Sequence, residues 1–90
     1  MDEATFRAKL AAEGFPEPQL IEKSPHDMPS EHAHDFTAMA LILAGEFSVV
    51  TRDGTATCRA GDTFTLAAGV PHYERYGAEG ARFLISRKTP

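Results

Sequence analysis

The chain has 90 residues, of which 42% are hydrophobic and 24% are charged, with a formal net charge of −4 and a pI of about 5.4. This length suits a single domain, and the composition is ordinary for a globular protein. The acidic balance argues against a nucleic-acid partner, which needs a basic stripe, and gives no reason to expect binding to anionic membranes.

The first predicted element is a short helix over Asp2–Glu13. Asp2 is a suitable N-cap, and Gly14 is a suitable C-terminal stop. Phe6 and Leu10 lie one helical turn apart and form a narrow apolar stripe. We therefore expect the helix to pack as a lid on a larger body.

The rest of the chain has the pattern of a β-protein. Prolines at positions 16, 18, 25 and 29 exclude a helix and predict an extended segment. Short β-prone runs then alternate with turn signals, and Asp53-Gly54 predicts a hairpin turn of type I′. The expected strands are 37–43, 46–51, 55–59, 63–67, 70–75 and 82–87. Strands at this spacing predict an all-β sandwich or barrel.

The strand predicted over 37–43 is apolar on both faces. One face carries Ala38, Ala40 and Ile42. The other face carries Met39, Leu41 and Leu43. One face is expected to line the inside of the barrel, and the other needs a cover. The N-terminal helix, a second sheet or a partner subunit would each provide one, so a homodimer is one of the open interpretations.

Three histidines form the most informative pattern. His32 and His34 are two residues apart, so on a strand their side chains point to the same side. A hairpin-rich barrel can bring His72 to the same point, and three imidazoles in an apolar cup form a metal site. The alternatives are surface histidines on a strand edge and a turn-capping His72. His26 lies outside the pattern and is expected to be solvated or to lie beside the ligands.

The histidines also stand in two longer patterns. The first is His32-Ala33-His34, three residues, Ala38, six residues and Gly45. The second is Gly61, five residues, Ala67-Ala68-Gly69, two residues and His72. In this order and spacing they resemble the two motifs of the cupin superfamily of small β-barrels. The resemblance implies a single cupin domain over 1–90, with a helix over 1–14 and an all-β jelly-roll barrel over 20–87.

Four positions depart from these motifs. His26 stands in place of a glycine, Ala38 of the usual glutamate ligand, Ala67 of a proline and Tyr76 of an asparagine. The resemblance thus implies a site of three histidines without that carboxylate. Three neutral imidazoles leave the charge of a divalent ion uncompensated, which favours an anionic guest. Imidazole ligands suit iron, zinc, nickel and copper. The expected cofactor is therefore one of these divalent metals or manganese.

Other side chains near His72 are candidates for chemistry. Tyr73 and Tyr76 are the candidate catalytic residues, each as an acid or an orienting group, although a regular strand cannot point both inward. Packing with a hydrogen-bonded hydroxyl is the simpler interpretation. Glu74 shares the strand face of His72 and could supply a carboxylate, but we expect a solvated glutamate. Cys58 is expected to be a buried structural residue.

Two functions follow as hypotheses. The first is a metal-dependent enzyme, a dioxygenase-like oxidoreductase or an isomerase or lyase, acting on a small anionic molecule. Four apolar residues are expected to shape its cup: Phe36, Ala40, Ile42 and Phe64. The second is a non-catalytic binding or sensor module with a structural metal or none. The stretch 32–45 also resembles the sensor domains of sugar-responsive regulators, although the chain has no helix-turn-helix segment.

The expected compartment is the cytoplasm. Cys58 is the only cysteine, so no disulfide can form within the chain, as suits a reducing compartment. The first residues lack the basic and apolar segments of a signal peptide, and the apolar run 38–44 is too short to cross a bilayer. The expected partner is a small-molecule ligand or substrate, without nucleic acid or membrane.

Overall fold

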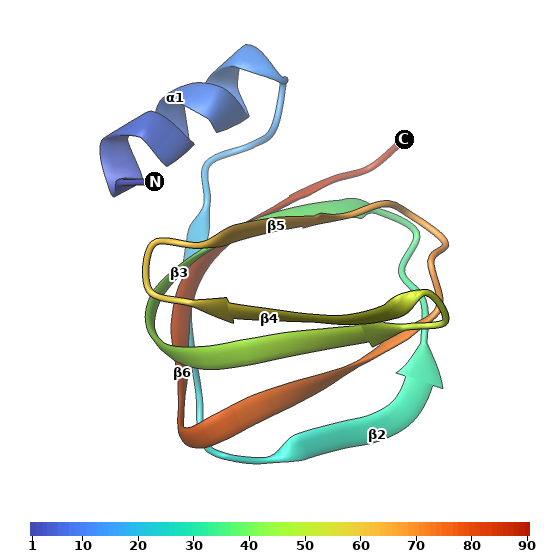
Figure 1. Cartoon of the computed structure of the whole chain (residues 1–90). Helices are drawn as coiled ribbons and strands as arrows, with labels where there is room; N and C mark the ends of the chain where they lie inside the picture. Colours follow the sequence, from blue (N-terminus) through green and yellow to red (C-terminus); the bar gives the residue numbers. More distant parts are fainter.

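The computed structural model describes the backbone of residues 1–90 and all side chains except those of residues 27–29. It is an all-β barrel with one short N-terminal helix (Figure 1). The elements, in chain order, are α1 (Glu3–Ala12), β1 (Gln19–Lys23), β2 (Asp27–His32), β3 (Thr37–Thr51), β4 (Gly54–Arg59), β5 (Thr63–Leu66) and β6 (His72–Lys88). No described helix is long and apolar enough to cross a membrane.

The helix α1 confirms the first prediction. The Asp2 carboxylate accepts a hydrogen bond from the backbone N–H of Thr5 at 2.7 Å, and this bond lowers the pKa of Asp2. Glu13 is the C-terminal cap, and Gly14 follows with φ of 76°, a conformation that glycine adopts without strain. The stripe of Phe6 and Leu10 is fully buried, at 0% and 1% exposure.

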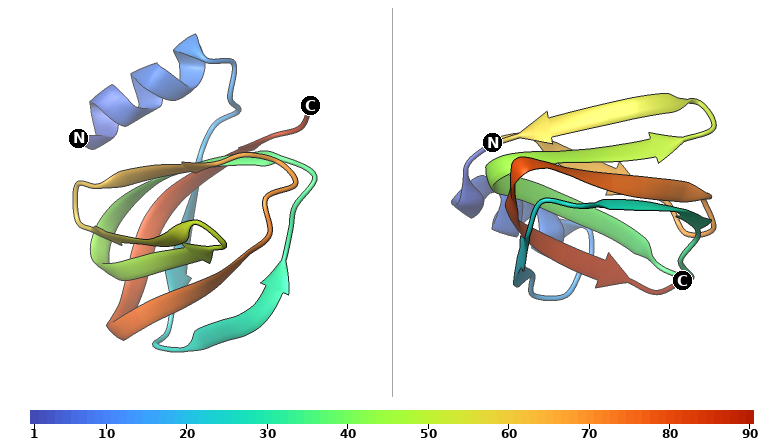
Figure 2. Two further views of the ribbon diagram at one scale, coloured as in Figure 1. Left: turned by 45° about the vertical axis from the view of Figure 1, so that its right-hand side comes forward. Right: turned by 90° about the horizontal axis from the view of Figure 1, so that it is seen from below.

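Two long strands carry the sheet. β3 and β6 pair with each other in antiparallel fashion over most of their length, β1 and β2 pair with β6, and β4 and β5 pair with β3. Figure 2 shows how the strands curve around a common interior. β6 pairs with β1, β2 and β3 along its length, so this C-terminal strand holds the N-terminal strands β1 and β2 in the sheet.

Each long strand is one element, so the prediction of two separate strands in each place is wrong. The predicted strands 37–43 and 46–51 are one strand, β3, and 70–75 and 82–87 belong to β6. The register shifts on both sides of Gly45, so the glycine bends the strand without ending the ladder. Gly45 has φ of 79°, and a Cβ there would collide with the backbone of Gly80 on β6. The bend therefore requires glycine.

The hairpin between β3 and β4 exists, but its predicted turn type is wrong. Thr51 pairs with Gly54, so the loop consists of residues 52–53, and no non-glycine residue of the described backbone has positive φ. A type I′ turn needs positive φ at both loop residues. In the turn before β5, the Asp62 carboxylate accepts a hydrogen bond from the backbone N–H of Arg59 at 2.9 Å and so stabilises the turn.

Apolar residues gather on both faces of β3, as the sequence predicts. Inside the barrel they join a core of Ala40, Ile42, Phe47, Val49, Cys58, Tyr76, Ala81 and Phe83. On the outer face Met39, Leu41 and Leu84 pack against Phe6 and Leu10 of α1. Figures 1 and 2 show α1 lying outside the barrel. The helix is thus the cover of this face, and the homodimer remains a prediction that this face does not require.

Candidate metal centre

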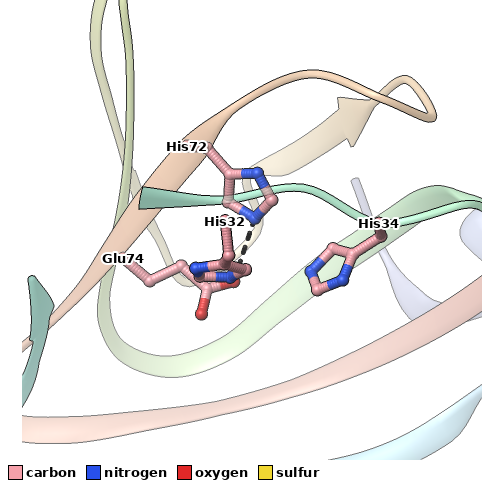
Figure 3. Close-up of side chains that lie close together, drawn as sticks. All are labelled: His32, His34, His72 and Glu74. Atoms are coloured by element: carbon pink, nitrogen blue, oxygen red, sulfur yellow. Dashed lines mark ion pairs between the residues drawn. The ribbon is translucent and has the colours of Figure 1, made fainter. Parts of the chain in front are cut away.

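Three histidines and one glutamate meet at one point. Each of His32, His34, His72 and Glu74 offers a ligand atom, and these atoms all lie within 4.8 Å of one another. Figure 3 shows the four side chains gathered around a common space. The ring centroids are 4.4 Å apart for His32 and His72, 5.0 Å for His34 and His72, and 5.1 Å for His32 and His34.

The histidines come from β2, from the segment after it and from β6. His32 ends β2 and pairs with His72, the first residue of β6. His34 lies beyond the end of β2, so the premise that both residues share one regular strand is wrong. The two rings still converge, and the His34 backbone carbonyl accepts a hydrogen bond from the Gly69 N–H at 2.8 Å, which ties the segment after β2 to the segment before β6.

Hydrogen bonds to backbone carbonyls orient two of the rings. The Nδ1 of His72 lies 2.9 Å from the carbonyl oxygen of Val70, and the Nδ1 of His32 lies 3.0 Å from that of Ser30. A carbonyl oxygen only accepts, so each Nδ1 carries the proton and donates it. The Nε2 of each neutral ring then keeps its lone pair, which is the state a metal ligand needs.

The buried Nε2 of His72 is the strongest evidence that the cluster fits a cation. The His72 side chain is 1% exposed, and its Nε2 has no hydrogen-bond partner in the described part of the chain. The nearest carboxylate oxygen, Oε1 of Glu74, lies 3.8 Å away. Leaving a buried acceptor unpaired costs about 1–3 kcal/mol, so this atom calls for a partner, and a divalent cation would satisfy it.

Glu74 is the residue that sequence reasoning undervalued. It shares the inward face of β6 with His72, but we expected a solvated side chain. In the structure its side chain is 18% exposed and its carboxylate joins the cluster. The carboxylate that the cupin resemblance places at position 38 is therefore available from another strand. The two-residue spacing from His72 was the feature of the sequence that indicated this position, because residues two apart on a strand point to the same face.

The surroundings of His34 oppose its protonation. Burial lowers its pKa, and the neighbouring His72 and His32 lower it further, while Glu74 acts in the opposite direction and Arg87 adds a smaller lowering. A neutral imidazole is the form that binds a metal. The arrangement thus keeps His34 in its ligating form at neutral pH.

The two tyrosines have different places. Tyr76 is buried, and its hydroxyl donates a hydrogen bond to Oε2 of Glu74 at 3.4 Å. Burial and the Glu74 charge raise the pKa of Tyr76 well above its usual range, so its hydroxyl stays protonated. Tyr73 lies between the inward-facing positions of β6, with the Arg75 guanidinium 5.7 Å from its ring centre, and does not line the cavity described below.

His26 and Cys58 lie outside the cluster. The His26 ring is exposed, donates from Nδ1 to the Ser24 carbonyl at 2.6 Å and packs on Tyr76 with ring centres 4.7 Å apart. Cys58 belongs to the barrel core, and burial raises the pKa of its thiol. The exposed His26 and the buried Cys58 are thus placed as the sequence predicts.

The cluster opens onto a cavity of about 210 Å³. Its lining includes Ile21, Lys23, His32, His34, Phe36, Ala38, Phe47, Phe64, Leu66, His72, Glu74, Tyr76, Phe83, Ile85 and Arg87. Two of the four residues expected to shape the cup, Phe36 and Phe64, line this cavity, whereas Ala40 and Ile42 lie in the packed core instead. The four residues of the cluster thus form one wall of an otherwise mostly apolar chamber.

Comparisons with solved structures agree with the barrel. A protein of the DUF861 family from Thermotoga maritima shares 22% identity, with a TM-score of 0.66, over 93% of this chain and 90% of its own. An RmlC-like cupin from Shewanella frigidimarina shares 19% identity, with a TM-score of 0.63, over 82% and 68%. A Bacillus subtilis oxalate decarboxylase variant shares 23%, with a TM-score of 0.62, over 78% of this chain but 20% of its own.

Family assignment rests on a match that covers most of the chain. No curated protein matches significantly. The model of a family described as "AraC-like ligand binding domain" matches residues 20–86, which include every strand but β1's first residue and the end of β6. The chain is therefore a small cupin and belongs to the family of AraC-like ligand-binding domains.

Proposed function

We propose that the chain is a divalent-metal-dependent enzyme that acts on a small organic anion, with His32, His34 and His72 as the metal ligands. The observation that carries the proposal is the unpaired, buried Nε2 of His72 on the wall of a cavity. Structural metal sites are usually closed by protein ligands, whereas catalytic sites keep a position open to substrate. A cluster that faces a chamber has the second arrangement.

The side chains of the cluster indicate a first-row transition metal. Three imidazoles and one carboxylate suit iron, zinc, nickel, manganese or copper. Such an ion, when bound, supplies Lewis acidity or, if it is redox-active, oxygen-dependent chemistry. The proposed reaction class is accordingly a dioxygenase-type oxidation or a Lewis-acid isomerisation or lyase reaction.

The protein's own groups have distinct roles in this proposal. The Val70 and Ser30 carbonyls hold the His72 and His32 rings with their Nε2 atoms available. Tyr76 donates to Glu74 and so fixes the orientation of that carboxylate. Because its pKa is raised, Tyr76 is suited to donate a hydrogen bond and not to act as a base. Tyr73, which lies away from the cavity, has no part in the proposal.

A second candidate function is a non-catalytic small-molecule sensor. The description of the matched family as a ligand-binding domain supports it. In this case the cavity and the cluster would bind a ligand without converting it. The sensor would hold a structural metal or none, whereas the enzyme requires the metal, so the two candidates are separated by product analysis on a ligand known to bind.

Elemental analysis by mass spectrometry tests the metal site that the proposed enzyme requires. Wild-type protein, purified without a metal-binding tag, is compared with His34→Ala and with the matched control His26→Ala, a histidine outside the cluster. About one equivalent of a first-row metal per chain is expected in the wild type and in His26→Ala, with loss in His34→Ala. Absence of metal from the wild type, even after reconstitution, would overturn the proposal.

A further inference from the structure

One arginine gives the cavity a second polar feature. Arg87 lines the cavity together with Phe83 and Ile85, its neighbours at two-residue spacing on β6. These three residues share one face of the strand. The partner of Arg87 on β3 is Ala38, which also lines the cavity. A methyl group beside the guanidinium leaves space there, whereas aromatic rings fill much of the remaining wall.

The Arg87 guanidinium is held at a defined place relative to the histidines. It lies 5.7 Å from the ring centre of Phe36, and the Phe36 ring stacks on His34 at 4.6 Å with an interplanar angle of 12°. On its other side, Nη1 of Arg87 donates to the side-chain oxygen of Gln19 at 3.3 Å. Phe36 thus connects the guanidinium to the cluster through two ring contacts.

The charge of Arg87 has no carboxylate partner among the described side chains. Four other arginines do have one: Arg7, Arg52, Arg59 and Arg82. A divalent ion at three neutral imidazoles and the Glu74 carboxylate would leave one further positive charge on the same cavity. Lys23 also lines the cavity and adds a positive charge, so the metal-loaded cavity would be positive in a chain whose net charge is −4.

We propose that the cavity binds a small organic carboxylate, with Arg87 pairing one carboxylate group and the rest of the ligand reaching the histidine–glutamate cluster. This deepens the proposed function and rests on it. The planar guanidinium binds a carboxylate through two parallel hydrogen bonds. The cavity, at about 210 Å³, is smaller than the roughly 300–1,000 Å³ of pockets for drug-sized ligands, so the ligand is small.

Calorimetric titration of metal-loaded protein with glycolate, succinate and glutarate tests the proposal, with glycolamide, succinamide and glutaramide as neutral controls. Arg87→Met removes the charge, and Arg82→Met is the matched control, because Arg82 lies on β6 outside the cavity and pairs with Glu22. We expect Arg87→Met to bind the preferred carboxylate about 10- to 100-fold more weakly. Arg82→Met is expected to bind it as the wild type does, and the amides are expected not to bind.

A second variant, Ala38→Glu, introduces a carboxylate of the protein itself beside the Arg87 guanidinium. In Ala38→Glu the new carboxylate stands opposite Arg87 on β3, so we expect carboxylate binding to be lost. Because the cupin motif has a metal-ligating glutamate at this position, metal content and melting temperature are measured on the same sample, and both are expected to match the wild type. Equal binding by Arg87→Met and the wild type, equal loss in Arg82→Met, or no binding of any carboxylate would overturn the proposal.

Metal content separates this test from that of the proposed function. If the wild type takes up no metal, the proposed function fails. The same titrations in metal-free protein then decide whether Arg87 binds carboxylates. If the metal binds but Arg87→Met has no effect, the carboxylate proposal fails and the metal site stands.

Discussion

His32 and His72 are cross-strand partners at the ends of β2 and β6, and their ring centres lie 4.4 Å apart. Each ring donates its Nδ1 proton to a backbone carbonyl two residues earlier in the chain. The same kind of local hydrogen bond thus orients two candidate ligands from different strands. Their Nε2 atoms are free for a metal because the backbone, and not another side chain, fixes the rings.

Glu74 tests whether the cluster includes a carboxylate ligand. Glu74→Gln keeps the shape of the side chain but removes its charge, so zinc affinity is expected to fall at least about tenfold. Glu79→Gln, an exposed position on the same strand, is the control and is expected to leave the affinity unchanged. Competition with a chromophoric chelator measures both, and equal affinities would mean that Glu74 does not ligate.

A variant at Tyr76 tests whether its hydroxyl positions the Glu74 carboxylate. Tyr76→Phe removes the hydroxyl that donates to Glu74 but keeps the buried ring. Loss of such an outer hydrogen bond typically lowers metal affinity or activity by about 10- to 100-fold, and we expect an effect near the lower end because the 3.4 Å bond is long. In Glu74→Gln the same change is expected to cost less, since the pair acts together. Additive losses would contradict this coupling.

Leu10 tests the role of α1 as the cover of β3. Leu10→Ala removes a side chain that is 1% exposed, so the free energy of unfolding is expected to fall by about 2–5 kcal/mol. Leu20→Ala makes the same chemical change at a position that is 48% exposed, and a change within about 0.5 kcal/mol is expected. Urea denaturation measures both. Comparable losses would mean that the helix does not bury this face as described.

Gly45 tests the requirement for a bend in β3. Gly45→Ala forces positive φ on a residue with a side chain and also places its Cβ against the Gly80 backbone. Gly69→Ala imposes a similar φ, +81°, with no atom within 4 Å of the added carbon. We expect about 1–2 kcal/mol of destabilisation in Gly69→Ala and clearly more in Gly45→Ala. Equal melting temperatures of the two variants would argue against the close contact of β3 and β6.

Cys58 provides a prediction about pH. Burial and the nearby Asp62 raise the pKa of its thiol above the ordinary 9.0, so the folded chain keeps this proton at pH values where the unfolded chain loses it. The resulting stability is present below the ordinary pKa and is lost as the pH rises toward the folded value. Wild-type stability is therefore expected to fall more steeply above about pH 9 than that of Cys58→Ala. Parallel pH profiles of the two proteins in urea denaturation would refute this.

The barrel, the helix and the convergence of the three histidines could all be predicted from the sequence, for different physical reasons. Helix caps and apolar periodicity are local, so Asp2, Phe6 and Leu10 could be assigned directly. The histidines were recognisable by their spacing. β1 and β2 were expected only as extended chain, because prolines mark what is not a helix but do not say which strand the segment will pair with.

The parts that escaped prediction depend on long-range geometry. The bend at Gly45 resembled a turn because glycine marks both a turn and a bulge, and only the ladder with β6 distinguishes them. The place of Glu74 depended on which face of β6 is inward. Arg87 was not singled out at all, since its nearness to His34 arises through Phe36 and not through sequence spacing.

The most direct measurement is a zinc titration of metal-free protein, followed by the melting temperature, in the wild type, His72→Ala and His26→Ala. A ligand at 100 times its dissociation constant stabilises the folded state by about 2.7 kcal/mol. The account predicts one high-affinity site and a clear rise in melting temperature in the wild type and His26→Ala, and neither in His72→Ala. Equal binding in His72→Ala, or none in the wild type, would contradict a metal centre built on the buried Nε2 of His72.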